Sequence, residues 1–106
     1  MKKELFNAIN NNDVNEVRRW INSGVDINAK NICGNTPLIE ACMIDNYEIA
    51  EVLIEAKADV NAESDLGYTA MMEAYINKNI KIIKLLMLNG ADYDKQIIDF
   101  LENFNN

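Results

Sequence analysis

The sequence predicts an all-α fold, a solenoid of antiparallel helix pairs joined by hairpin-like loops. The first observation is a repeat: aligned without a gap, residues 31–63 and 64–96 share nine identical positions, against about two expected by chance for typical composition. The second is spacing, because apolar residues recur at i, i+3 and i+4 in each half of a unit. The third is composition, since 49% of the 106 residues are hydrophobic and 25% are charged, as in globular chains.

Residues 1–30 are the first of three units in a single domain that spans residues 1–106. The register reaches back into this unit, which lacks its opening turn, as three equally spaced aspartates indicate: Asp26, Asp59 and Asp92. Glu16 and Arg19 stand where the second unit has isoleucine and valine. An outer face without an apolar neighbour is expected at the end of a repeat stack, so this unit is interpreted as an N-terminal cap.

Residues 31–63 form the second unit, which shows the helix signals most completely. Thr36 supplies a hydroxyl cap and Pro37 occupies the first helical turn, where its missing N–H costs nothing. The first helix has an apolar stripe of Leu38, Ala41 and Cys42. Asp45 and Asn46 interrupt the pattern. The second helix has a stripe of Ile49, Val52, Leu53 and Ala56.

Residues 64–95 form the third unit, and residues 96–106 are predicted to be a C-terminal cap. The second helix of the third unit ends at Asn89 and Gly90, a left-handed termination signal. The proposed cap is a short amphipathic helix with its apolar side formed by Ile97, Ile98, Leu101 and Phe104. A detachable helix that binds a partner is the alternative for this segment. With a cap at each end, we expect a complete small array.

The repeated motifs resemble the ankyrin repeat. The segments that carry the resemblance are Gly34-x-Thr36-Pro37-Leu38, Ile49-Ala50-x-Val52-Leu53, Ala58-Asp59-Val60-Asn61-Ala62, Gly67-x-Thr69-Ala70-Met71, Ile82-Ile83-x-Leu85-Leu86 and Gly90-Ala91-Asp92. They cover roughly residues 3–95 at a fixed period, which makes the resemblance highly specific. It implies a stack whose loops project as fingers. It also implies that fingers and first helices line a concave face on which partner proteins usually dock.

Two departures from the ankyrin pattern carry structural consequences. The histidine that follows Thr-Pro-Leu in the family is replaced by Ile39 and Met72, so its hydrogen bonds between neighbouring loops must be missing or replaced. Lys57 stands where the other units have Gly24 and Gly90. We expect this lysine to adopt a positive φ, at a cost of about 1 kcal/mol relative to glycine.

Charge and residue content argue against several classes of function. The net charge of −7 disfavours binding to phosphate backbones or anionic lipid, so no nucleic acid and no membrane is expected as a partner. The chain has no histidine and two cysteines, so no metal site, no cofactor and no catalytic residue is expected. Glu40 and Glu73 are 33 positions apart. We interpret them as equivalent structural positions whose side chains bind loop backbone, and not as an acid–base pair.

Carried over from the resemblance, the partner-binding face comprises residues of two fingers and two first helices. Asn10, Asn11 and Lys30 of the first unit also fall at such positions. The set is apolar for positions that the fold does not need to bury, and soluble monomers seldom expose large apolar patches without a use. The predicted partner-binding residues are Ile32, Cys33, Asn35, Met43, Ile44, Asp65, Leu66, Tyr68, Ile76 and Asn77.

The function predicted from these residues is a non-enzymatic protein–protein interaction module that binds a basic or apolar segment of another protein. Self-association through the same apolar strip is the alternative, which makes a homodimer the alternative to a monomer. An enzyme is a third, weaker interpretation. The expected location is cytoplasmic, since the N-terminal segment has no signal-peptide core. A scaffold, an inhibitor and an effector delivered into a host cell all remain open.

Overall fold

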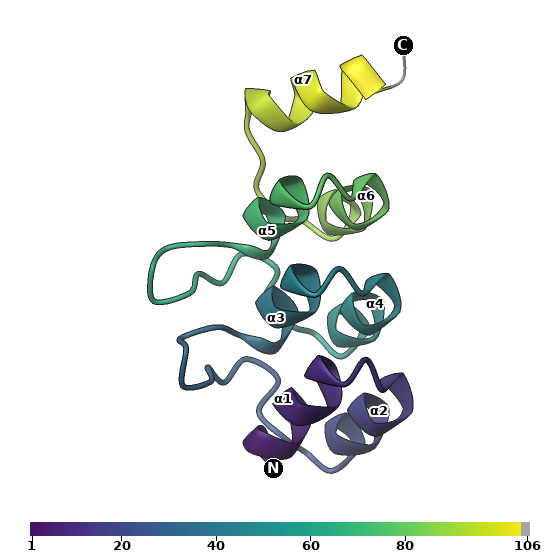
Figure 1. The fold of residues 1–106 in the computed structure, drawn as a ribbon, viewed down its shortest axis with the longest axis vertical. Coiled ribbons are helices and arrows are strands. Elements are labelled where there is room, and N and C mark those ends of the chain that lie inside the picture. Colours follow the sequence, from purple (N-terminus) through teal and green to yellow (C-terminus); the bar gives the residue numbers. More distant parts are fainter. Residues whose placement is uncertain (105–106) are drawn as a thin grey trace.

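Stacked helix pairs make up the computed structural model, which describes residues 1–104 (Figure 1). Over these residues the order is α1 (Lys2–Asn10), α2 (Val14–Asn22), α3 (Pro37–Met43), α4 (Tyr47–Glu55), α5 (Ala70–Ile76), α6 (Ile80–Leu88) and α7 (Lys95–Phe104). Figure 1 shows α1, α3 and α5 on one side of the stack, next to the projecting loops, and α2, α4 and α6 on the other. The molecule measures 43 × 26 × 21 Å. The all-α solenoid predicted from the sequence is confirmed.

Side-chain caps begin the helices at equivalent positions of successive units. The hydroxyls of Thr36 and Thr69 each accept a hydrogen bond from the backbone N–H three residues on, at 3.2 Å. The second helices use asparagine instead: Asn46 and Asn79 each accept from the N–H three residues on, at 2.9 Å. These contacts satisfy N–H groups that have no partner within the helix. They explain why the apolar pattern is interrupted at Asn46, because this residue is the N-cap of α4.

Left-handed residues form the turns at two fixed places in each unit. Between the two helices of a pair they are Asn12, Asp45 and Lys78, with φ of 57°, 64° and 56°. After the second helix they are Gly24, Lys57 and Gly90, with φ of 87°, 75° and 90°. The positive φ predicted for Lys57 is therefore confirmed. The turn keeps the shape that glycine adopts elsewhere and leaves the lysine side chain exposed.

The core runs without interruption from one helix pair to the next. α3 packs against both α1 and α5, while α4 lies between α2 and α6. Leu5, Leu38 and Met71, at equivalent positions of the three units, are 0%, 1% and 4% exposed. Ile49 and Ile82 of the second helices are fully buried as well. Each unit thus covers the apolar flank of its neighbour, which is what stabilises a repeat stack.

Asparagine side chains at the turns between paired helices join successive units, away from the positions of the family's missing histidine. Asn46 Nδ2 donates to Asn12 Oδ1 at 3.0 Å, and Asn79 Nδ2 donates to Asp45 Oδ1 at 2.6 Å. Ile39, at the first histidine position, is buried, while Met72, at the second, is 46% exposed. The units are therefore joined by amide contacts at positions other than those of the family's histidine.

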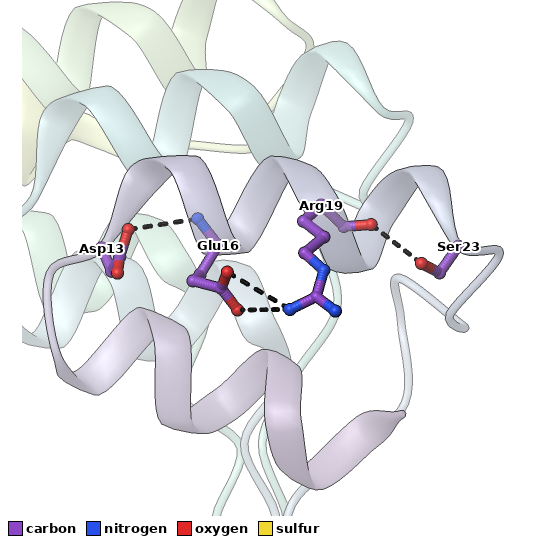
Figure 2. A network of polar contacts seen from close by, with 4 residues as sticks. All are labelled: Asp13, Glu16, Arg19 and Ser23. Atoms are coloured by element: carbon purple, nitrogen blue, oxygen red, sulfur yellow. Dashed lines mark hydrogen bonds and ion pairs between the residues drawn. The ribbon is translucent and has the colours of Figure 1, made fainter.

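The outer face of α2 is polar, in contrast to its equivalents further along the stack. Figure 2 shows Asp13 capping the helix through the N–H of Glu16 at 3.1 Å, and Ser23 Oγ donating to the carbonyl of Arg19 at 3.0 Å. Arg19 Nη1 and Glu16 Oε2 lie 3.3 Å apart. Ile49 and Val52, which occupy the equivalent positions of α4, are buried. This is the polar substitution expected of a first unit.

α7 packs on the third unit through a residue that the sequence pattern overlooked. Ile97 is buried as expected, but Phe100 makes the aromatic contact, edge-on to Tyr75 with ring centroids 5.5 Å apart. Phe104, expected on the apolar side, is 67% exposed, and its ring lies 6.2 Å from that of Phe100 between centroids. The assignment of residues 96–106 as a cap stays a prediction, and residues 105 and 106 lie outside the described part of the chain.

Candidate functional site

Two fingers project side by side from the first helices (Figure 1). The first is closed by a hydrogen bond from Asn31 N to Asn35 O at 2.9 Å, and the second by one from Ser64 N to Tyr68 O at 2.7 Å. The backbone N–H of Asp65 donates to the carbonyl of Gly34 at 3.0 Å and ties the second finger to the first. A side chain on Gly34 would collide with Asp65. Neighbouring fingers are therefore held in contact at their backbones.

The tips of both fingers carry apolar side chains that nothing covers. Ile32 is fully exposed and Leu66 is 83% exposed. Cys33, beside Ile32, is also exposed, whereas Cys42 is buried. Asp65 at the second tip forms an ion pair with Lys30, with Nζ and Oδ1 3.0 Å apart. The side chains of Ile32 and Leu66 therefore contribute nothing to the packing of the core.

The first helices and the base of the second finger, which holds Tyr68, contribute the other predicted residues in unequal measure. Met43 is 45%, Tyr68 48% and Ile76 62% exposed. Ile44 differs from the expectation, because it is half-buried and packs against the core. The core takes up part of its side chain, and the remainder is open to a partner.

The two predicted amide side chains serve the scaffold. Asn77 Nδ2 donates to the carbonyls of Cys42 at 2.9 Å and Met43 at 3.3 Å, which links α5 to α3. Asn35 Nδ2 donates to Glu40 Oε1 at 3.2 Å, and Asn31 Nδ2 to the same oxygen at 2.8 Å. The expectation that Glu40 binds loop backbone is therefore wrong: it binds side-chain amides, because the backbone donors of the finger are turned to Asn31 itself.

A groove of about 540 Å³ lies at the C-terminal end of this face, between α5, the base of the second finger and the start of α7. Tyr68 and Ile76 line it, so the structure brings together two of the predicted residues there. Met72 and Tyr93 line it as well and were missed. Neither position suggested a binding role in the sequence. Met72 stands where the family has a histidine that bonds loops, and Tyr93 is equivalent to Val60, which is half-buried.

Carboxylates crowd the space between α3 and α5. Burial, together with the nearby charge of Glu40, raises the pKa of Glu73 above its ordinary value. Burial and the charges of Glu73 and Asp45 raise the pKa of the Cys42 thiol to about 12. A thiol with such a pKa stays protonated at neutral pH and is a poor nucleophile or metal ligand.

Among residues 1–104, no group of three or more histidine, cysteine, aspartate or glutamate side chains is placed to hold a metal ion. In the same part of the chain, none of the helices has the length and apolar character needed to cross a membrane.

Stacked helix pairs with paired fingers define a helical repeat protein of the solenoid class. Residues 5–97 match the family model described as ankyrin repeats, in three copies. The chain belongs to the ankyrin repeat family. Ankyrin repeats generally act as protein–protein interaction modules, and the family is typically non-enzymatic. No curated protein matched the chain in a sequence search.

Proposed function

We propose that this chain is a non-enzymatic module that binds a partner protein through the concave face formed by its fingers and first helices. The observation that carries the proposal is the exposed apolar surface on that face. Ile32, Leu66 and Ile76 are the most exposed large apolar residues there. Covering such a side chain contributes about 1.5–3 kcal/mol, so a few of them are enough for specific binding.

The rigid backbone of the fingers supports this function. A surface whose loops are already ordered loses little conformational entropy when a partner docks. The finger bonds between Ser64 and Tyr68 and between Asp65 and Gly34 supply that order. Tyr68 suits an anchor, because its ring is stiff and amphipathic, and Met43 can adapt to the partner's shape.

The proposed contact set follows exposure and therefore departs from the sequence prediction at three positions. Ile44 is left out because it is half-buried against the core. Asn35 and Asn77 remain as residues that shape the face, while Met72 and Tyr93 are added.

The two free thiols fit a reducing compartment, so we place the interaction in the cytoplasm.

Affinity capture from a native lysate, read by mass spectrometry, tests the proposal. We expect Leu66→Ser and Tyr68→Ala each to reduce recovery of a specific partner at least about fivefold relative to wild type. Leu88→Ser is the matched control, since Leu88 is 85% exposed but belongs to α6 on the opposite side of the stack. Equal loss with the control, or a lowered melting temperature in the face variants, would argue against a docking role.

Self-association through the same apolar strip is the competing outcome. Sedimentation velocity over a series of protein concentrations distinguishes the two. We expect a monomer whose sedimentation coefficient does not change with concentration. A dimer that Leu66→Ser dissociates and Leu88→Ser leaves intact would replace partner binding by pairing of two chains.

A further inference from the structure

The groove at the C-terminal end of the concave face has an apolar floor. Met72, Ile76 and Tyr93 are 46%, 62% and 51% exposed and share this groove with Tyr68. Its volume of about 540 Å³ is in the range of sites that bind small molecules or peptide side chains. The segment between α6 and α7 forms one wall, and α7 begins directly beyond it.

The charge of the groove is one-sided. Glu63, Asp92 and Asp94 line it, and no lysine or arginine is among the residues of the described chain that do so. The ion pairs that the structure describes tie up other carboxylates, such as Asp65 and Asp99. Three carboxylates around an apolar floor produce a negative potential that a groove of low dielectric concentrates. A cationic group entering the groove is therefore favoured over a neutral or anionic one.

Aromatic rings add a second reason for a cation to bind. Tyr68, Tyr75 and Tyr93 all line the groove, and a tyrosine ring attracts a cation to its face. The molecule already shows this contact: the ammonium of Lys78 lies 3.6 Å from the ring centroid of Tyr75. A guanidinium or ammonium can thus meet both carboxylates and ring faces in one site.

We propose that this groove binds a segment of a partner protein in which basic side chains alternate with apolar ones. The inference rests on the proposed function and deepens it by naming the place and the chemistry of the contact. The apolar side chains cover Met72 and Ile76, and the rings of Tyr68 and Tyr93 are open to the cationic groups. The basic side chains lie against Glu63, Asp92 and Asp94. The fingertips then serve as the outer rim of the interface and not as its centre.

An NMR titration with three synthetic peptides tests the proposal. The probe is an acetylated and amidated octapeptide in which arginine and leucine alternate. One control peptide has glutamate in place of arginine, and the other has serine in place of leucine. We expect the probe to bind at least about tenfold more tightly than either control. The largest amide shifts are expected at Met72, Ile76 and Tyr93.

Matched charge variants separate a site from a diffuse field. We expect Glu63→Gln combined with Asp92→Asn to weaken binding of the probe at least about fivefold. Glu48→Gln combined with Glu55→Gln changes the net charge equally, but on the exposed side of α4. That control is expected to weaken binding less than about twofold. Unchanged melting temperatures establish that both double variants fold.

Several results would overturn the inference. Equal weakening by the two double variants would show attraction to the overall charge of the chain and not to a site. If the probe peptide does not bind, the groove does not recognise this chemistry. If the largest amide shifts fall on Ile32 and Leu66, the contact lies outside the groove. Shifts that depend on protein concentration without peptide would assign the groove to a second copy. In the first three cases the proposed function stands if a lysate partner still depends on Leu66, so the two failures are distinguishable.

Discussion

The side chain of Asn61 bridges to Asp92: its Oδ1 accepts the backbone N–H of Asp92 at 2.7 Å. Its Nδ2 donates to the carbonyl of Gly90 at 3.1 Å. One unit earlier, Asn28 Oδ1 accepts the N–H of Asp59 at 2.8 Å. In each of the first two units, an amide side chain two residues beyond the turn aspartate therefore links that unit to the next, in a chain that lacks the family's histidine.

Removing this bridge is expected to loosen the third unit. Asn61→Ala should lower the free energy of unfolding by about 1–2 kcal/mol, because two hydrogen bonds are lost and the N–H of Asp92 loses its partner. Urea denaturation followed by circular dichroism measures the change. Asn15→Ala is the control, since Asn15 is exposed on α2 and its replacement should change the value by less than about 0.5 kcal/mol. Equal effects would rule out the bridge as a stabilising contact.

Replacing Lys57 by glycine should stabilise the fold. Its φ of 75° is strained for a residue with a Cβ, so Lys57→Gly is expected to raise the free energy of unfolding by about 0.5–1 kcal/mol. The same replacement at Lys84, in the middle of α6, should instead lower it by about 1 kcal/mol. Paired urea titrations give both values. A shift in the same direction for the two variants would contradict the conformational explanation.

Phe100 should hold α7 on the stack. Phe100→Ala removes the edge-on contact with Tyr75 and the ring that lies 5.1 Å from Lys78 Nζ, at an expected cost of about 1–3 kcal/mol to the docking of α7. Hydrogen exchange should then show lost protection in α7 with α1–α6 retained. Phe104→Ala, at an exposed ring, serves as the control. Similar loss of protection in both variants would mean that helix propensity, and not this contact, holds α7.

Glu73 should make the fold less stable as the pH rises. Its pKa is raised in the folded state by burial and by the charge of Glu40, so the folded protein binds the proton more tightly than the unfolded chain. Stability is then highest below the ordinary carboxyl pKa and is lost as the pH rises through the folded-state value. We expect Glu73→Gln to exceed wild type in free energy of unfolding at pH 7 and to lose that advantage near pH 3. A difference that does not change with pH would refute this.

The caps and the strained turn were predictable because their causes are local. A threonine before proline starts a helix, and a lysine at a glycine position of the repeat must take the same positive φ. The buried stripe of Leu38, Ala41 and Cys42 also follows from spacing alone. The partial burial of Ile44 could not be predicted, for the opposite reason. Whether a residue just past a helix end faces solvent or core depends on how the neighbouring unit packs.

The sequence by itself determined that this chain is an array of capped helix pairs, because a fixed period and nearest-neighbour signals suffice to specify each pair. Only the tertiary structure decided that Met72, Ile76 and Tyr93 share one groove lined by three carboxylates. The position of Tyr93 depends on where the chain turns into α7, whose Phe100 packs edge-on against Tyr75. Contacts between residues far apart in the chain, such as Tyr75 and Phe100, leave no periodic trace in the sequence.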